Sequence, residues 1–247
     1  MNERACMTSA GDVDAGMDAG GYPVETTGNA VLDTLEHRSS TRAFARDDDD
    51  RPVAVTDEQR AAILHAASRA PSAGAMMMYS IVSIREQATL DRLADLCDHQ
   101  PMIAKAPWAL IFVVDYAKWI DLFEHVGCFE PEFVERTGKA PRRAPGLGDF
   151  DLPPYTMPLS MLIIGTPRKE RPAIAHPVVN LVHEERYCRA DAATMDAQVA
   201  EMDAMFRPHA REVGERVVDI YTRKHTSPFM AEMSRSMEWW FKNWLGK

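Results

Sequence analysis

A chain of 247 residues with 46% hydrophobic residues is long enough for one large or two small globular domains with a sizeable core. Its net charge of −9, from 37 acidic and 28 basic residues, argues against nucleic acid or an anionic membrane as a partner. Four widely spaced cysteines form no CxxC pair, so reduced thiols are expected rather than a zinc site or a disulfide framework.

The N-terminal residues 1–22 are rich in Gly, Ala, Asp and Met and have no apolar period, so we expect a poorly ordered extension. This segment lacks the hydrophobic region of a secretory signal. No run in the chain reaches the roughly 18 apolar residues needed to cross a bilayer. We therefore expect a cytoplasmic protein in which residues 23–247 form a single domain.

Two helices are predicted after the extension. Val31, Leu32 and Leu35 share one face of a short helix that ends near His37. The sequence TDEQ, beginning at Thr56, is typical of a capping box, and the helix that it starts ends before the proline at position 71.

Three segments have the character of strands. Tyr79–Arg85 alternates and is rich in β-branched residues, whereas Trp108–Asp115 is a near-continuous apolar run, typical of a strand covered on both faces. Leu159–Gly165 is a second run of that covered kind. Residues 90–97 have helical spacing, and the Pro/Gly/Arg-rich stretch 131–154 is a predicted loop.

Helical patterns dominate the C-terminal part, over Ala192–Phe206 and Arg211–Tyr221. Ser227 is a good N-cap and Pro228 suits the first position of a last helix. Its apolar stripe steps by three and four residues: Met230, Met233, Met237, Trp240 and Trp244. Such a stripe packs on the chain's own core or on a dimer partner. Mixed strands and helices indicate an α+β or α/β fold around a central sheet.

The sequence HRSSTRAF contains two arginines, Arg38 and Arg42, on either side of two hydroxyls, Ser39 and Ser40. Guanidinium groups and hydroxyls are the donors that a phosphate monoester needs. A second basic string, PRKERP, follows a predicted strand and adds Lys169 and Arg171. Each string by itself is more often a solvated turn.

The helix exit APSAGAMMMYS has small residues, a proline and a glycine, which let a backbone approach a flat ligand closely. Three consecutive methionines offer a polarizable apolar wall. Taken alone, the segment is more often a loop followed by core methionines.

Together these three motifs resemble the FMN-binding pattern of the nitroreductase family. The resemblance runs from Asn29 to Tyr187, with further matches in the K-A-P lead-in to one strand and the L-P-x-x-x-x-P lead-in to another. It implies an α+β fold with a central mixed sheet flanked by helices, and a C-terminal arm helix that packs on the partner of a homodimer. It also implies non-covalent FMN at the dimer interface, with NAD(P)H as the electron donor and a nitroaromatic, quinone or similar small molecule as the acceptor in a ping-pong sequence.

The same resemblance assigns the cofactor-binding residues. The phosphate is expected to lie on Arg38, Ser39, Ser40, Arg42, Lys169 and Arg171, and the flavin ring along Pro71, Ser72, Ala73, Gly74, Ala75 and Met77. The flavin carries the chemistry, so no catalytic acid, nucleophile or metal is expected.

Three departures from the family pattern bear on activity. Ala75 replaces a frequent Asn and Met77 replaces a frequent Gln, which removes side-chain hydrogen bonds to the ring. Gly165-Thr166-Pro167 replaces Gly-Tyr-Pro. The family's long helix and Gly-Leu-Gly strand have little room in about 116–151, so this element is either deleted or missing from the sequence. A flavin-binding protein of the same fold, with specialised dehalogenase-like or lost turnover, is the alternative.

Overall fold

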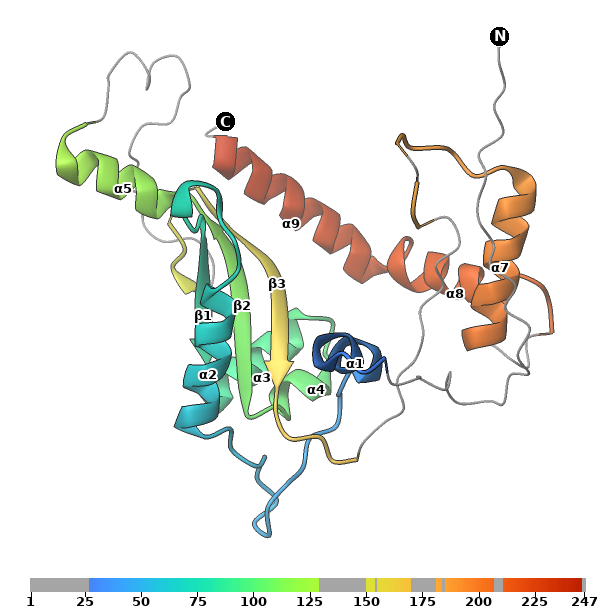
Figure 1. The fold of residues 1–247 in the computed structure, drawn as a ribbon, viewed down its shortest axis with the longest axis horizontal. Helices are drawn as coiled ribbons and strands as arrows, with labels where there is room; N and C mark the ends of the chain where they lie inside the picture. The colour runs from blue at the N-terminus through green and yellow to red at the C-terminus, as the bar shows by residue number, and fades with distance from the viewer. Residues whose placement is uncertain are drawn as a thin grey trace. The chain divides into compact units, whose positions relative to one another are not determined.

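The computed structural model describes residues 27–128, 150–153, 155–169, 181–183, 185–206 and 211–245, drawn in colour in Figure 1. The predicted N-terminal extension and most of the predicted loop 131–154 lie outside these ranges. The chain divides into two compact units. The first takes in Met1–Ser40 and Arg171–Ala231, and the second takes in Thr41–Glu170 and Glu232–Lys247. The single domain expected over 23–247 stays a prediction.

The second unit is built on a three-stranded sheet in the order β1-β2-β3. Its strands are β1 (Tyr79–Ile84), β2 (Trp108–Asp115) and β3 (Thr156–Ile164). Both pairings are antiparallel, so the mixed sheet expected from the resemblance is not found among the described residues. The reason lies in the connection between β1 and β2. It contains two helices, α3 (Gln87–Leu96) and α4 (Pro101–Ala104), which return the chain to the end of the sheet that it left.

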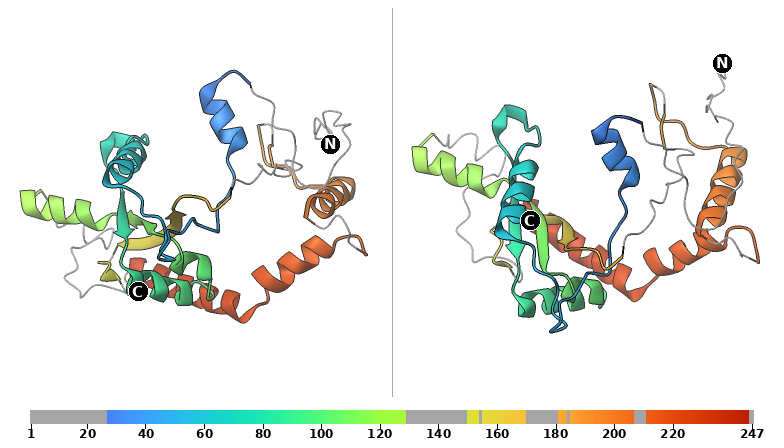
Figure 2. Two further views of the ribbon diagram at one scale, coloured as in Figure 1. Left: turned by 90° about the horizontal axis from the view of Figure 1, so that it is seen from below. Right: turned by 60° about the horizontal axis from the view of Figure 1, so that its bottom comes forward.

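The core of the second unit forms on both faces of β2, as its apolar sequence predicts. On one face, Ala109, Ile111 and Val113 are buried with side chains of α3 and α4. On the other, Trp108 and Leu110 are buried as well, and helix α2 lies along this face (Figures 1 and 2). Strand β2 therefore lies at the centre of the sheet, between β1 and β3, with buried side chains on both of its faces.

Strand β3 corrects the expectation that Leu159–Gly165 is covered on both faces. Within the described chain β3 pairs only with β2, and Leu159 and Leu162 are 68% and 49% exposed. The pairing shifts where Pro158 faces Val113, leaving Leu159 as the extra residue of a bulge. Proline cannot donate to a sheet ladder and is therefore confined to edge strands and bulges. The apolar run thus predicted the strand correctly, but it did not predict that side chains of this strand are exposed.

Two helices of this unit differ in how well the sequence predicted them. Helix α2 (Asp57–Ser68) begins with the expected capping box, in which the Thr56 side chain accepts from the Gln59 N–H and the Gln59 side chain accepts from the Thr56 N–H. Helix α5 (Ala117–Val126) was not predicted, although apolar residues spaced by three and a terminal Gly127 at φ 73° are typical of a helix and its end.

The first unit contains α1 (Ala30–His37), α7 (Ala192–Phe206) and α8 (Glu215–Lys224). Helix α7 has the predicted bounds, whereas α8 begins and ends several residues later than the predicted Arg211–Tyr221. Asp203 of α7 accepts from the backbone N–H groups of Gly214 and Arg216 at the start of α8, over 2.5 and 3.0 Å. These charge-assisted bonds hold the two helices together. No helix in the described ranges is both long and apolar enough to cross a membrane.

The last helix, α9 (Pro228–Leu245), starts as predicted, with the Ser227 hydroxyl accepting from the Met230 N–H over 3.3 Å. Its stripe divides between two environments. Trp240 packs against the core cluster of the sheet, and Trp244 stacks edge-on against Tyr155 at 6.2 Å. Two other members of the stripe, Met233 and Met237, are 39% and 36% exposed. The helix therefore packs partly on its own chain, and its role as a dimer arm stays a prediction.

Candidate functional site

The end of one predicted phosphate motif runs beside the start of another in the second unit. The Arg168 N–H donates to the Ala43 carbonyl oxygen over 2.9 Å, and Phe44 pairs antiparallel with Pro167. A further backbone hydrogen bond of 2.8 Å follows at the next position. The HRSSTRAF and PRKERP strings are more than a hundred residues apart in sequence, so only the folded sheet brings them together.

The close approach of these strings depends on Gly165, which follows β3. A Cβ atom at this position would lie 2.7 Å from the Phe44 Cδ1 atom and 2.7 Å from the Pro107 Cδ atom. Phe44 is buried and a proline ring is rigid, so neither neighbour can withdraw easily. A side chain larger than hydrogen at this position would push the two basic strings apart.

Continuing the antiparallel register outward from Phe44 and Pro167 would place Arg42 opposite Lys169. Both side chains are exposed, and neither forms an ion pair with any described residue. Two exposed cations on a pair of hydrogen-bonded segments, with an arginine fork among them, match the double negative charge of a phosphate monoester. The arrangement supports a phosphate site at this end of the sheet.

The other predicted phosphate ligands are not brought to the paired strings by any described contact. Arg38 is the C-cap residue of α1 and is exposed, Ser39 is half-buried and Ser40 is exposed. All three belong to the first unit, so their participation stays a prediction. Arg171 lies outside the described residues.

The predicted flavin loop follows α2 and has an unusual backbone. Ala73–Ala75 form one 3-10 turn, with Gly74 at φ 58°, and both Ala75 and Met77 also have positive φ, at 53° and 44°. The Ser72 hydroxyl accepts from the Met77 N–H over 2.8 Å and closes the loop on itself. Pro71 is exposed, as is most of the loop. This surface can lie against a flat ligand, as the small residues predicted.

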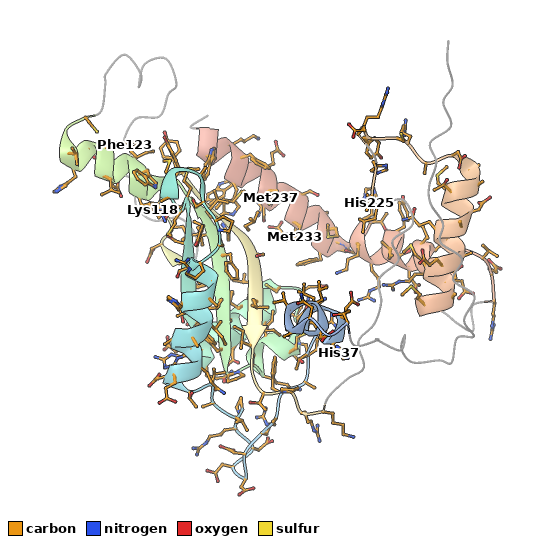
Figure 3. All side chains as sticks on the ribbon, viewed as in Figure 1. His37, Lys118, Phe123, His225, Met233 and Met237 are labelled. Atoms are coloured by element: carbon orange, nitrogen blue, oxygen red, sulfur yellow. The ribbon has the colours of Figure 1, made fainter. Side chains whose placement is uncertain are left out.

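Two residues of α5 that the sequence did not indicate contact this loop and the start of β1. Trp119 Nε1 donates to the Met76 carbonyl oxygen over 2.6 Å, and Lys118 Nζ donates to the Tyr79 carbonyl oxygen over the same distance. Figure 3 labels Lys118 where α5 meets the sheet. The Tyr79 hydroxyl is buried and has no hydrogen-bond partner among the described residues. The helical spacing of apolar residues in α5 is the sequence signal that would have pointed to Lys118 and Trp119.

The flavin loop and the paired basic strings lie at opposite ends of the sheet. The loop leads into β1 at Tyr79, opposite Val114 near the end of β2, whereas the basic string follows Ile164, opposite Trp108 at its start (Figure 1). Eight residues of extended strand span roughly 23 Å. Among the described residues of one chain, then, the HRSSTRAF string pairs with the PRKERP string at Ala43 and Phe44, but neither string meets the flavin loop.

Ala75, which stands where the family frequently has Asn, has a left-handed backbone conformation, and this leads to a prediction. Asparagine adopts positive φ more readily than alanine, so Ala75→Asn should stabilise the protein by about 0.5–1 kcal/mol. Thermal unfolding at equal flavin saturation would measure this change. Ala73→Asn is the matched control, because Ala73 lies in the same turn without a positive φ. A gain of the same size at both positions would contradict the backbone explanation.

The sequence model of the nitroreductase family matches residues 35–206, which include all the predicted binding motifs. The chain belongs to the nitroreductase family. The recognition made from the three motifs is confirmed.

Two characterised relatives of this nitroreductase-family chain are similar in sequence. The FMN reductase [NAD(P)H] of Bacillus subtilis is 25% identical over 205 residues, covering 69% of this chain and 79% of the relative. The NADPH-flavin oxidoreductase of Vibrio harveyi is 30% identical over 109 residues, covering 44% and 41%. Both names agree with the expected oxidoreductase class, FMN cofactor and NAD(P)H donor.

Solved structures confirm the α+β fold class. The hypothetical oxidoreductase YcnD from Bacillus subtilis superposes with a TM-score of 0.62 at 20% identity, over 86% of this chain and 97% of that one. The NADPH:FMN oxidoreductase from Vibrio harveyi complexed with NAD⁺ superposes with a TM-score of 0.59 at 19% identity, over 84% and 97%. At these identities the superpositions show the fold alone.

Proposed function

We propose that this nitroreductase-family protein is an FMN-dependent oxidoreductase that takes electrons from NAD(P)H and passes them to a nitroaromatic, quinone or similar small acceptor. The observation that carries the proposal is the backbone pairing of two strings of the family's binding pattern, at Ala43 with Arg168 and at Phe44 with Pro167. The names of the two sequence relatives support the donor and the cofactor.

The described residues fit FMN chemically at both of its ends. Arg42 and Lys169 supply positive charge for the phosphate, and the exposed loop at 72–77 offers small side chains and backbone groups to the ring. When bound, FMN would accept a hydride from NAD(P)H and give the electrons to the acceptor. The chain's own residues bind the phosphate, leave one face of the ring accessible and hold donors near it. Donor and acceptor then use the same face in turn, which is a ping-pong sequence.

We place the FMN site at the interface of a homodimer. Within one chain the 72–77 loop and the paired basic strings lie at opposite ends of the sheet, so the two halves of the site do not meet. A second copy can bring its 72–77 loop to the basic strings of the first. Exposed apolar residues support such an interface, and they lie on β3 and α9: Leu159, Leu162, Met233, Met237, Trp239 and Phe241. The C-terminal helix would act as the arm expected from its stripe.

Mixing two defective chains tests this shared site. An Arg42→Ala/Lys169→Ala chain lacks the phosphate half, and a Gly74→Val chain strains the loop half, since Gly74 has φ 58°. Refolding the two together should restore FMN binding in heterodimers, where one of the two sites has neither defect. Each variant refolded alone is the control. No recovery in the mixture would mean that both halves act within one copy or that no such dimer forms.

A second candidate function is a flavin-binding protein of the same fold with lost or specialised turnover. Ala75 and Met77 favour it, because neither side chain can hydrogen bond to the ring as Asn and Gln would. A specialised relative, such as a reductive dehalogenase, would use the same phosphate site with a different acceptor.

An absorption spectrum of the purified protein separates these functions. A flavin spectrum that bleaches when NADPH or NADH is added without oxygen is the result expected for the oxidoreductase. A flavin spectrum that persists with both nucleotides would favour the binding protein without turnover. Protein that is colourless and takes up no added FMN would contradict both.

We also propose a cytoplasmic location. The three described cysteines, Cys97, Cys128 and Cys188, are free thiols, as a reducing compartment would keep them. Burial raises the pKa of the Cys97 thiol, which favours the thiol over the nucleophilic thiolate. The acidic net charge supports the expected absence of a nucleic-acid partner.

A further inference from the structure

The flavin loop cannot hold its shape by local preference alone. Gly74, Ala75 and Met77 all have positive φ, a region that residues with side chains avoid. Inside the loop the Met77 N–H donates to the Ser72 hydroxyl, and backbone hydrogen bonds run from the Ala75 N–H to the Ser72 carbonyl oxygen and from the Met76 N–H to the Ala73 carbonyl oxygen. A strained backbone of this kind persists only where surrounding groups hold it.

The surrounding groups come from one short segment, the end of β2 and the first turn of α5. The Asp115 N–H donates to the Met78 carbonyl oxygen over 3.0 Å, and Trp119 Nε1 donates to the Met76 carbonyl oxygen over 2.6 Å. Lys118 Nζ donates to the Tyr79 carbonyl oxygen, and the same ammonium group lies 5.7 Å from the Tyr79 ring centroid. Three carbonyl oxygens between positions 76 and 79 are therefore held by donors from outside the loop.

Helix α5 can act as a firm support because its other face is anchored. Ala117 and Ile120 are buried in a cluster with Tyr155. Trp119 packs against Phe123 with 5.6 Å between ring centroids, and both side chains are half-buried. Figure 3 labels Phe123 on α5. The indole thus has contacts at both its N–H and its ring.

We propose that Trp119, assisted by Lys118, is a positioning residue that sets the conformation of the 72–77 loop for contact with the flavin ring. This inference rests on the proposed function, in which that loop lies along the ring. Trp119 acts through the Met76 peptide and does not itself touch the cofactor. Its loss should therefore weaken flavin binding and change the surroundings of the ring, with little effect on the core.

The test compares two Trp→Phe variants that each remove one indole hydrogen bond. Trp119→Phe removes the bond to the loop, while Trp108→Phe removes a bond of 2.9 Å to Ser83 Oγ at the other end of β2. Trp108 is completely buried, so its replacement should be the more destabilising of the two. Thermal unfolding, FMN titration and the shape of the visible flavin band are measured for both variants and the unaltered protein.

We expect Trp119→Phe to raise the dissociation constant of FMN by about fivefold and to alter the flavin band. Trp108→Phe should lower the melting temperature more while its FMN affinity changes by less than about twofold. Unchanged FMN binding in Trp119→Phe, or an equal loss of FMN affinity in both variants, would overturn the inference about Trp119 and leave the proposed function standing. If Trp119→Phe does not fold, Lys118→Met provides the same test with the same outcomes. Failure of the unaltered protein to bind FMN would overturn the proposed function and this inference with it.

Discussion

Replacing Arg42 and Lys169 together with alanine should raise the dissociation constant of FMN by roughly two orders of magnitude or more. Both side chains are exposed on the paired strings and have no carboxylate partner among the described residues, so their charge is available to a phosphate. Each charge-assisted contact that is lost removes more binding energy than a neutral hydrogen bond would. Fluorescence titration of the flavin-free protein with FMN measures the change.

The matched control removes one arginine and one lysine elsewhere, in an Arg51→Ala/Lys105→Ala variant. Both residues are exposed in the same unit and lie outside the two paired strings, so this variant should keep its FMN affinity. Higher salt should weaken FMN binding to the unaltered protein more than to the Arg42→Ala/Lys169→Ala variant, because screening acts on the charges that are present. Equal losses in the two double variants would attribute the effect to net charge and not to this site.

Gly165→Ala should destabilise the protein by about 1–3 kcal/mol and weaken FMN binding as well. The added Cβ would lie 2.7 Å from both the Phe44 ring and the Pro107 ring, closer than carbon atoms pack. Relief requires Phe44, which is buried, or the backbone that carries the PRKERP string to move. Such movement separates the two basic strings, so stability and affinity should fall together. Denaturant unfolding and FMN titration on the same sample measure both.

A double-mutant cycle identifies the clash as the cause. Phe44→Ala removes the ring atom that the new methyl group would meet, while the contact with Pro107 stays. The combined Gly165→Ala/Phe44→Ala variant should therefore be less destabilised than the sum of the two single variants. Simple additivity would show that the new methyl group does not meet the Phe44 ring, and an unaltered stability in Gly165→Ala would show that the close approach at this glycine is not tight in solution.

The sequence by itself determined most of the helices and strands, because their signals are local. The apolar run at Trp108–Asp115 and the helical pattern at Ala192–Phe206 have the bounds of β2 and α7 as predicted. The hydroxyl and amide of the capping box at Thr56 also lie within one turn of each other, so spacing alone identified them. Three short motifs in the right order were enough to identify the family, since each needs only a few neighbouring residues.

Tertiary structure alone decided which of these segments meet. Nothing in HRSSTRAF predicts that Phe44 will lie opposite Pro167, because their contact depends on the order and direction of three strands. The exposure of Leu159 follows from the absence of a described neighbour on its side of β3, which an apolar run does not report. The bond from Trp119 to Met76 joins a helix and a loop 43 positions apart. Local sequence thus sets the backbone conformation, whereas burial and the assembly of a binding site depend on long-range pairing that only the folded chain supplies.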